Sequence, residues 1–519
     1  MASASLLRSL WGQSELLLNA TQVRSGVEWA GSDLRLACVR DALIQHRRLS
    51  IGAIGGSITA GSTYAAGRLS SGFTYHEKVQ LALNALYWPK PANDLTRPAS
   101  HHLLNGGVPG TGPTYMEHCV HDHLPKDVDL VLLEYAVNTD HRPEAFERLL
   151  RKLLVHSRFP AIIVVNAHRW RVIRGTDGRV DKCWNKKWSD HVADLEHNAT
   201  QWAAQTWGET PGLVPGRPDL GPMPHFAGEL NADEDAIASL CHHYDVPLVS
   251  MRGSMLAAVR SGRLHIPSFM NDCRHPNGQG HTFLSQSILE RIISPPADGG
   301  TTICEGQRSL PALPPPLFGE AVSSSSTSTC ARGSALSHHT AWTKGFVLTD
   351  EGRGPGKMGY MALKPGASMG LCLPASDRVS NLWLGYLRSY EHMGRVEVTC
   401  MGACRCSPLV IDGHEVRDGI SVTDVKKLTL KPVAQGEGVT LQKEWPTNAS
   451  TCCAVTLRVL RDSTSGEHKF KLMSLLLGGA DAGSIQLFSM RVAASAAEDV
   501  AHGRARHRRR WPAKGRVHK

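Results

Sequence analysis

Residues 49–61 read Leu-Ser-Ile-Gly-Ala-Ile-Gly-Gly-Ser-Ile-Thr-Ala-Gly, an apolar run that ends in two glycines and a serine. A short apolar run of this kind is typical of a strand that is buried on both faces of a parallel sheet. The two glycines let the backbone bend sharply after the strand, so the hydroxyl of Ser57 is left uncovered at the carboxyl edge of the sheet. Open α/β sheets bind their ligands at that edge, and Ser57 is therefore a candidate functional residue.

The same alternation continues to about residue 295 and predicts an α/β domain over residues 41–295, after an N-terminal segment of residues 1–40. It implies a flavodoxin-like, doubly wound parallel sheet with right-handed crossovers. The predicted strands are 49–54, 128–133, 161–166 and 246–250, and the predicted helices are 75–87, 143–156, 190–207, 230–244 and 279–293.

The composition changes after residue 295. Residues 296–339 are rich in Pro, Gly, Ser and Thr and cannot bury much apolar surface, so we predict a linker. Residues 340–480 contain short alternating runs separated by Gly and Asp turns, which predict a mainly antiparallel β-sandwich domain. These runs are 345–348, 360–363, 382–387, 395–399, 455–460 and 469–477.

The net charge of +10 is concentrated in the last segment, residues 481–519. Between Arg504 and Lys519 there are eight Lys or Arg residues and no Asp or Glu. We interpret this segment as a solvated basic tail and predict no nucleic-acid partner, because aromatic residues are not interleaved with the charges. The hydrophobic content of 41% is ordinary for a soluble globular protein, and no apolar stretch approaches the ~20 residues that span a bilayer.

Three further segments supply what a nucleophilic serine requires. A serine is a poor nucleophile unless a base accepts its proton, and the segment Asp272-Cys-Arg-His275-Pro-Asn offers one. Asp272 and His275 are three residues apart, so the carboxylate can orient the imidazole while the imidazole faces Ser57. The turn Asn-Gly-Gly-Val-Pro-Gly110 presents a backbone N–H, and Asn138, just past a predicted strand, presents a side-chain amide. Together with the N–H of Ser57, these groups form a candidate oxyanion hole for acyl transfer.

The four segments resemble the four blocks of the SGNH (GDSL-type) hydrolase superfamily, which is named after its Ser, Gly, Asn and His residues. The resemblance covers roughly residues 45 to 295. It implies that Ser57 is the nucleophile, that Gly110 and Asn138 belong to the oxyanion hole, that His275 is the general base and that Asp272 orients it.

Two positions depart from the family pattern. Gly56 precedes the serine where the family name expects Asp, and Thr139 separates Asn138 from Asp140 where the family often has Asn-Asp. Neither departure removes a catalytic group. The whole chain is also similar to SGNH-type proteins of green algae and plants that carry a β-rich C-terminal extension.

Other residues near the predicted strand ends are candidates for substrate contacts. Glu134, Asn166 and His168 fall on the same edge of the sheet, and we predict that they line a substrate pocket. The Trp184–Trp188 stretch lies in an insertion between a strand and a helix, where it either contacts substrate or packs.

Two groups of histidines are open to other interpretations. His118, His121 and His123, with Asp122, invite a metal hypothesis, but we interpret them as a solvated helix end and predict no metal site. We interpret His281 as part of the start of a helix rather than as a second base.

Eight of the thirteen cysteines lie after residue 300, among them Cys400, Cys404, Cys406 and the adjacent Cys452 and Cys453. Disulfides are the favoured interpretation, and a zinc site is the alternative. Cysteines and sequons favour the secretory pathway or the extracellular space, but residues 1–21 show no uninterrupted apolar region of a signal peptide. The compartment therefore stays open. The sequons are at Asn19, Asn198 and Asn448.

These observations favour a serine ester hydrolase that acts through an acyl-enzyme on O-acyl, especially acetyl, esters of glycans or polysaccharides. The alternatives are an acyltransferase or a lipid esterase with the same residues, or an inactive glycan-binding or structural protein. Trp383, Tyr386 and Tyr390 either stack on sugar rings or fill the core of the second domain, and we favour the core. The chemistry requires no cofactor, and the sequence predicts no oligomeric state.

Overall fold

The computed structural model describes residues 4–12, 16–61, 74–89, 100–139, 143–156, 158–170, 232–261, 263–264, 266–272, 274–294, 312–318, 329–352, 357–374, 381–416, 421–433, 445 and 452–478. Several predictions concern residues outside these ranges. They are the helix 190–207, the Trp184–Trp188 stretch, the sequons at Asn198 and Asn448, and the basic tail. Among the described residues, no helix combines the length and the apolar character needed to cross a membrane.

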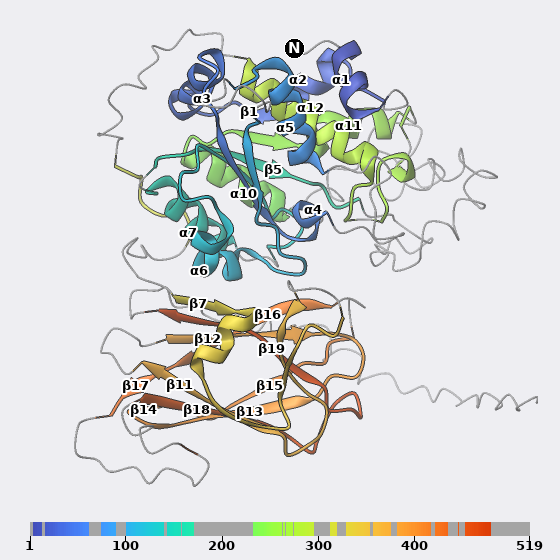
Figure 1. The fold of residues 1–519 in the computed structure, drawn as a ribbon. Helices are drawn as coiled ribbons and strands as arrows, with labels where there is room; N and C mark the ends of the chain where they lie inside the picture. Colours follow the sequence, from blue (N-terminus) through green and yellow to red (C-terminus); the bar gives the residue numbers. More distant parts are fainter. Residues whose placement is uncertain are drawn as a thin grey trace, which may run out of the picture. The chain divides into compact units, whose positions relative to one another are not determined.

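The first part of the chain forms an α/β domain around one six-stranded sheet with the strand order β1-β6-β5-β4-β2-β3 (Figure 1). Five strands are parallel to their neighbours, and β1 pairs with β6 in the antiparallel direction. The predicted parallel sheet is thereby confirmed, with one antiparallel strand added at its edge. The strands are β1 (Val27–Trp29), β2 (Ser50–Gly55), β3 (His102–Asn105), β4 (Leu130–Glu134), β5 (Ala161–Asn166) and β6 (Leu248–Ser250).

Helices cover both faces of this sheet, and so every residue of β2, β4 and β5 is buried. One layer packs around α12 and contains α1 (Ala4–Trp11), α2 (Ala20–Gly26), α3 (Leu34–Ile44), α5 (Tyr75–Leu86), α11 (Met251–Arg260) and α12 (Gly278–Ile293). The other layer contains α6 (Pro113–His123), α7 (Pro143–Leu154) and α10 (Ala232–His243). The short helices α4 (Ser57–Ala60) and η2 (Ile266–Ser268) lie outside these layers.

The predicted N-terminal segment is part of this domain. The indole N–H of Trp11 donates to the carbonyl of Lys78 at 3.0 Å, and the N–H of Leu18 donates to Gln286 at 2.8 Å. Because β1 also joins the sheet, residues 16–40 complete the α/β layer rather than precede it.

The second part of the chain is a sandwich of antiparallel sheets, as predicted. One sheet has the order β16-β12-β19-β10-β9, with β7 also on β19, and the other has the order β15-β13-β18-β11-β8. Alternate residues of both sheets meet in one apolar core. The elements are β7 (Thr329–Arg332), η3 (Gly333–His339), β8 (Thr340–Lys344), β9 (Val347–Thr349), β10 (Gly359–Ala362), β11 (Ser368–Pro374), β12 (Asn381–Arg388), β13 (Arg395–Gly402), β14 (Cys404–Arg405), β15 (Leu409–Asp412), β16 (Val422–Thr429), β17 (Lys431–Pro432), β18 (Cys452–Val459) and β19 (Phe470–Gly478).

The range predicted as a linker contains two described stretches with fixed contacts. Strand β7 and η3 belong to the sandwich, because β7 pairs with β19. Residues 312–318 lie against the α/β domain, where Arg151 donates to the carbonyl of Pro314 at 2.6 Å and the N–H of Phe318 donates to Glu147 at 2.6 Å. This proline-rich stretch is held in place by hydrogen bonds between its backbone and charged side chains rather than by burial of apolar side chains.

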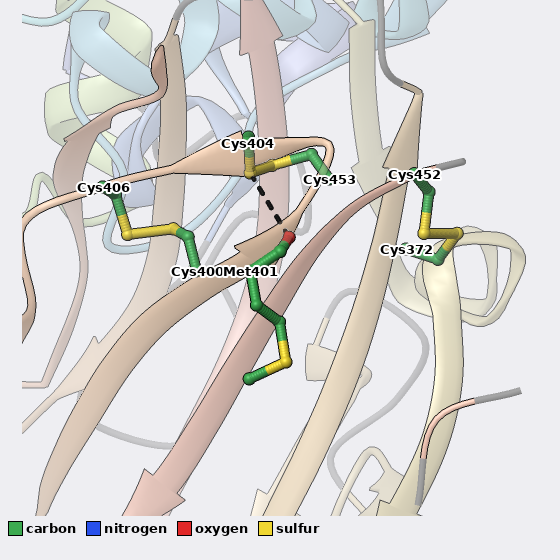
Figure 2. Close-up of a disulfide and its surroundings, with 7 residues drawn as sticks. All are labelled: Cys372, Cys400, Met401, Cys404, Cys406, Cys452 and Cys453. Atoms are coloured by element: carbon green, nitrogen blue, oxygen red, sulfur yellow. Dashed lines mark hydrogen bonds between the residues drawn. A yellow bond between two sulfur atoms is a disulfide. The ribbon is translucent and has the colours of Figure 1, made fainter. Parts of the chain in front are cut away.

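The cysteines of the sandwich that we considered as zinc ligands all form disulfides (Figure 2). A cysteine in a disulfide has no thiolate to offer a metal, so the disulfide interpretation is confirmed for them. The pairs are Cys372–Cys452, Cys400–Cys406 and Cys404–Cys453.

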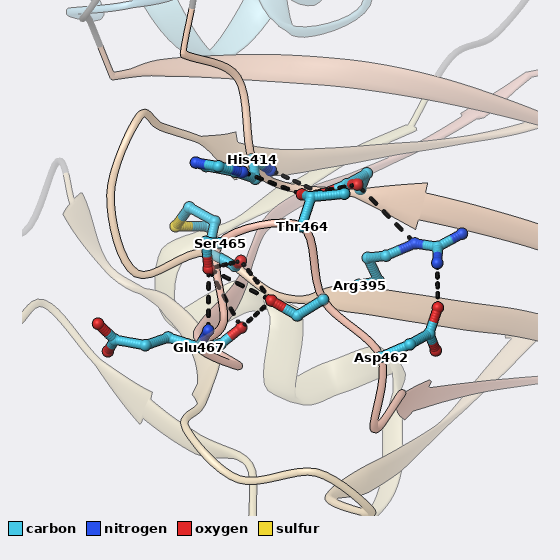
Figure 3. Close-up of polar contacts among 9 residues, drawn as sticks. Arg395, His414, Asp462, Thr464, Ser465 and Glu467 are labelled. Carbon is cyan, nitrogen blue, oxygen red and sulfur yellow. Dashed lines mark hydrogen bonds and ion pairs between the residues drawn. The ribbon is translucent and has the colours of Figure 1, made fainter. Parts of the chain in front are cut away.

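Polar side chains hold the turn between β18 and β19 (Figure 3). Arg395 forms an ion pair with Asp462, and Thr464 donates to Asp412 at 3.1 Å. The Nδ1 atom of His414 lies 2.9 Å from the same threonine hydroxyl. These contacts tie the turn to the ends of β13 and β15.

Candidate active site

The three residues predicted as nucleophile, base and orienting acid lie together at the carboxyl edge of the α/β sheet. Ser57 is the first residue of α4 and is separated from the end of β2 by Gly56 alone. Its Oγ lies 2.7 Å from Nε2 of His275, and Nδ1 of His275 lies 2.8 Å from Oδ2 of Asp272. The side chains of His275 and Asp272 are buried, and Ser57 is half-buried. A serine with a hydrogen-bonded base, itself oriented by a third group, is the arrangement that nucleophilic catalysis requires.

Asp272 is held in its ionised form. The N–H groups of Arg274 and His275 donate to its Oδ1 at 2.7 and 2.8 Å. Burial opposes ionisation, but the hydrogen bond and charge of His275 and these backbone bonds keep the pKa of Asp272 below its ordinary value. An ionised carboxylate can only accept, so Nδ1 of His275 carries the proton and Nε2 accepts from Ser57.

The remainder of the Asp-x-x-His-Pro-Asn segment fixes this turn to helix α12. The side chain of Asn277 is the N-cap and accepts from the N–H groups of Gln279 and Gly280 at 2.9 and 3.2 Å. The N–H of Asn271 donates to the carbonyl of His275 at 2.8 Å. Because Asn277 caps the helix, the carboxylate of Asp272 is left for the imidazole.

Gly110, the predicted oxyanion donor, lies in a tight turn after β3. The N–H of Thr111 donates to the carbonyl of Val108 at 3.3 Å, and Gly110 has a φ of 73°. Pro109 followed by a glycine with positive φ is the pattern of a type II turn. Upstream, the N–H of Val108 donates to the carbonyl of Gly55 at 2.9 Å, which joins the turn to the end of β2.

Asn138, the other predicted oxyanion residue, follows β4 and lies over the residue before the nucleophile. A Cβ atom on Gly56 would lie 2.4 Å from Oδ1 of Asn138, closer than real Cβ contacts. The turn that carries Asn138 is closed by its N–H, which donates to the carbonyl of Tyr135 at 2.9 Å. The departure from the family pattern at Gly56 thus has a steric reason, because the asparagine occupies the space of a side chain.

Glu134 lies behind the nucleophile turn and has no solvent exposure. Burial raises its pKa to about 8, although hydrogen bonds from Thr59 and from the backbone of Gly56 oppose the rise. Thr59 Oγ1 lies 3.4 Å from Oε2 of Glu134 and 2.9 Å from the hydroxyl of Tyr75. The position of Thr59, two residues after Ser57, is a sequence signal that we did not use, whereas Tyr75 comes from a distant helix with no signal of its own.

Asn166 and His168, predicted with Glu134 as substrate-lining residues, are also buried. The side-chain oxygen and nitrogen of Asn166 form no hydrogen bond with the described residues. His168 Nδ1 lies 2.8 Å from Oε2 of Glu234. Burial opposes ionisation of Glu234, but His168 and Arg252 hold its pKa below the ordinary value. Glu234 comes from α10, and nothing in the sequence predicts its pairing, so the role of the three residues stays a prediction.

Comparison with solved structures finds similar architecture in a two-domain esterase (CEX) that is active on acetylated mannans. Its structure has 19% sequence identity and a TM-score of 0.55, and the match covers 88% of this chain and 98% of that chain. The same esterase co-crystallised with mannopentaose matches with 18% identity and a TM-score of 0.55, over the same shares of both chains. No protein-family model matches the sequence, and no curated protein matches it.

The fold resembles that of a two-domain esterase. The likeness spans both parts of the chain and confirms the predicted order of an α/β domain followed by a β-rich domain. At this level of identity it concerns the fold, and the chemistry depends on the residues described above.

The prediction of a solvated helix end holds for His121 and Asp122, which are exposed, but not for the other two histidines of α6. His118 and His123 are buried. The ring centroid of His118 lies 4.4 Å from that of Trp383 in the sandwich, and Nε2 of His123 lies 3.1 Å from the hydroxyl of Tyr115. Burial lowers the pKa of each histidine to about 4. The prediction was wrong for His118 because the sandwich covers a helix face that would be solvated in the α/β domain alone.

The histidines of α6 were also considered as metal ligands. Among the described residues, no group of three or more His, Cys, Asp or Glu side chains is placed to hold a metal ion. His281, by contrast, lies in the first turn of α12 as expected, where its Nδ1 accepts from the N–H of Tyr75 at 3.1 Å.

One of the three sandwich aromatics fills the core. Tyr386 is buried there, and its ring stacks on Phe470. Trp383 is buried outside that core, where its ring meets His118 of α6. Tyr390 is 39% exposed. The core interpretation therefore holds for Tyr386 alone, and neither Tyr386 nor Trp383 presents an open face to a sugar ring.

Proposed function

We propose that the protein is a serine ester hydrolase that removes O-linked acetyl groups from polysaccharides through an acyl-enzyme. One observation carries the proposal. Ser57, His275 and Asp272 form a continuous hydrogen-bonded chain at the carboxyl edge of the sheet. The polysaccharide substrate is supported by the likeness to an esterase that is active on acetylated mannans, since both chains join an α/β domain to a β-rich one.

In the first half of the reaction, Ser57 Oγ attacks the carbonyl carbon of the ester while Nε2 of His275 accepts the hydroxyl proton. The carbonyl π electrons move to the oxygen, which becomes an oxyanion. When the tetrahedral intermediate collapses, the bond to the sugar oxygen breaks and His275 returns its proton to that oxygen. The products are a free sugar hydroxyl and an acetyl group bound to Ser57.

In the second half, water replaces the sugar. His275 accepts a proton from the water as its oxygen attacks the acetyl carbonyl, and collapse of the second intermediate releases acetate and returns the proton to Ser57. The ionised Asp272 stabilises the imidazolium that forms in both halves.

The oxyanion of each intermediate requires donors. We assign them to the N–H groups of Ser57 and Gly110 and to the side-chain amide of Asn138. Removing one such donor costs about 10²–10³-fold in rate in other serine hydrolases. The residues named here suffice for the chemistry without a metal or an organic cofactor.

The experiment is turnover of p-nitrophenyl acetate by the full chain and by Ser57→Ala. The proposal expects a loss of at least about 10³-fold in kcat, because the variant lacks the nucleophile. A fluorophosphonate label, mapped to its peptide, is expected on Ser57 and absent from the variant. Ser100→Ala is the matched control and should retain activity, because Ser100 is exposed and lies before β3, at the opposite edge of the sheet from the triad.

Substrate class is tested separately with acetylated mannan, acetylated xylan and a short-chain triglyceride. Acetate release from the polysaccharides at a higher kcat/KM than acid release from the triglyceride is expected. The reverse order would contradict the polysaccharide assignment and leave the serine chemistry in place. Unchanged p-nitrophenyl acetate turnover by Ser57→Ala would contradict the chemistry itself.

A further inference from the structure

The direction of the Gly110 N–H depends on a single peptide plane. In a type II turn, the middle peptide joins the second and third residues, here Pro109 and Gly110. Rotation of that peptide into the type I form would exchange the places of its N–H and its C=O. Glycine adopts both forms with little difference in energy because it has no Cβ. An oxyanion donor placed here therefore needs an outside restraint.

The sandwich contacts this peptide at its carbonyl and also contacts the next peptide along the chain. The N–H of Thr423 donates to the carbonyl of Gly110 at 2.7 Å. A Cβ atom on Gly110 would lie 3.3 Å from the carbonyl oxygen of Ser421 and from Cα of Val422, so the start of β16 packs directly against the turn. The Nζ atom of Lys357 lies 3.5 Å from the carbonyl of Pro109, at the opposite end of the same peptide from the Gly110 N–H.

Strand β16 has a free side on which to make this contact. It is the first strand in its sheet, and among the described strands it pairs with β12 alone, so the N–H groups on its other side face no partner strand. Edge strands carry such unpaired groups, and here one of them is used by the Gly110 carbonyl.

The helix that follows the turn is fixed to the same domain. Helix α6 begins three residues after Gly110, and its Cys119 forms a disulfide with Cys330 of β7. The ring of His118 meets Trp383 of β12. The turn and its helix are therefore both anchored to the sandwich. The sandwich cannot move far without disturbing Gly110.

We propose that Thr423 and Lys357 of the sandwich are positioning residues that hold Gly110 in the geometry of an oxyanion donor. The inference rests on the proposed function. It assigns to the second domain a part in catalysis that does not depend on binding a glycan. Thr423 fixes the location of Gly110, and Lys357 opposes rotation of the Pro109–Gly110 peptide.

The test is steady-state hydrolysis of p-nitrophenyl acetate by the full chain. This substrate has no sugar, so lost glycan contacts cannot change its rate. Thr423→Pro removes the N–H and is suited to an edge strand, where proline is tolerated with its nitrogen facing outward. We expect kcat to fall about tenfold with KM within about twofold, because a displaced donor loses part of the 10²–10³-fold that a donor contributes. Thr423→Ala keeps the N–H and should stay close to the wild type in both constants.

Lys357→Met provides a second variant that leaves the backbone unchanged, with Lys364→Met, an exposed lysine of the same domain, as its matched control. We expect about a threefold loss of kcat for Lys357→Met and none for the control. The inhibition constant of a boronic acid, which forms a tetrahedral adduct with the serine, should rise in step with the loss of kcat. A loss of fold alone would reduce the concentration of active sites without changing that constant.

The two hypotheses fail in different ways. If Ser57→Ala retains full turnover, the proposed function is wrong and the inference falls with it. If Ser57→Ala is inactive while Thr423→Pro is folded and has the kcat of the wild type, the inference alone is overturned. If Thr423→Pro does not fold, a wild-type kcat in Lys357→Met overturns it instead.

Discussion

At the scale of single residues, Gly56 shows how a departure from a family pattern can be compensated. The residue before the nucleophile has no side chain, and the Asn138 side chain lies where one would be. Glycine at this position therefore does not indicate a damaged site. It permits close packing between the nucleophile turn and a proposed oxyanion donor.

This packing predicts the effect of adding a side chain. Gly56→Ala should lower kcat by about tenfold or more, because the new methyl group would lie 2.4 Å from Oδ1 of Asn138 and displace it. Asn138→Ala should cost about 10²–10³-fold, as the loss of a donor does, and the double variant no more than the larger single loss. The measurement is a double-mutant cycle on kcat with p-nitrophenyl acetate. Independent, multiplicative losses would show that Gly56 acts in some other way.

The buried carboxyl of Glu134 predicts a dependence of stability on pH. Its pKa is raised from 4.5 to about 8 in the folded protein. The folded protein thus keeps a proton that the unfolded chain releases across that range. The stabilising contribution is complete below about pH 4.5 and is lost as the pH rises toward 8, by roughly 1.4 kcal/mol per pH unit at most.

Glu134→Gln removes this titration while keeping the shape of the side chain. Between about pH 5 and pH 8, the free energy of unfolding of the variant should improve relative to that of the wild type. Urea denaturation at the two pH values measures the difference. If the free energy of unfolding changed with pH equally in the two proteins, that result would show that Glu134 is ionised in the folded state.

At the scale of secondary-structure elements, α6 connects the two parts of the chain. It follows the Gly110 turn, bears Cys119, and has two buried histidines. Burial, partly offset by Glu117, lowers the pKa of His118 to about 4 from 6.5. The contribution of its neutral form to stability is present above about pH 6.5 and is lost as the pH falls toward 4.

His118→Gln should therefore weaken the acid sensitivity of the protein. Acidification from about pH 7 to pH 4.5 is expected to lower the free energy of unfolding more in the wild type than in the variant. His338→Gln, at an exposed histidine of the sandwich, is the control and should match the wild type. Equal acid sensitivity in all three proteins would contradict a neutral, buried His118.

Elements with strong local patterns are predictable from the sequence. The predicted strand 161–166 agrees with β5 at both ends, and the predicted helices agree with α12 and α5 to within one residue at each end. Strand β3 is missing from the prediction, since only Leu103 and Leu104 form its apolar run. Strand β16 is also missing from the prediction. It lies at the edge of its sheet, where a strand needs little apolar alternation, and its sequence is therefore mostly polar.

At the scale of the whole molecule, contacts between the two parts are beyond the reach of the sequence. Ser57, Asp272 and His275 can be predicted as a group because each lies in a local motif, and the structure brings them within hydrogen-bond distance. The pairing of Thr423 with Gly110 has no such signal, because a backbone N–H is the same in every residue but proline. The burial of His118 likewise depends on a tryptophan far along the chain.

The disulfide between Cys119 and Cys330 predicts how the two parts unfold. It spans 211 residues, whereas Cys400–Cys406 spans 6. In the chain-entropy view, the longer loop restrains the unfolded chain more, so its loss should cost about 2–5 kcal/mol. The variant with both Cys119 and Cys330 changed to Ala should show a lower Tm and a broadened or divided calorimetric transition. The matched Cys400→Ala, Cys406→Ala variant should lose less and keep one transition, and the reverse ranking would contradict the role assigned to the long loop.

The same disulfide has a consequence for biosynthesis. Cys119 leaves the ribosome 211 residues before its partner, which at roughly 5–20 residues per second is a delay of about 10–40 s. During that interval the α/β domain must fold around an unpaired thiol that is buried in the finished protein. Closure of the bond can only follow the arrival of β7, the first strand of the sandwich. A nascent α/β domain that is separated from its sandwich would keep an unpaired thiol at Cys119.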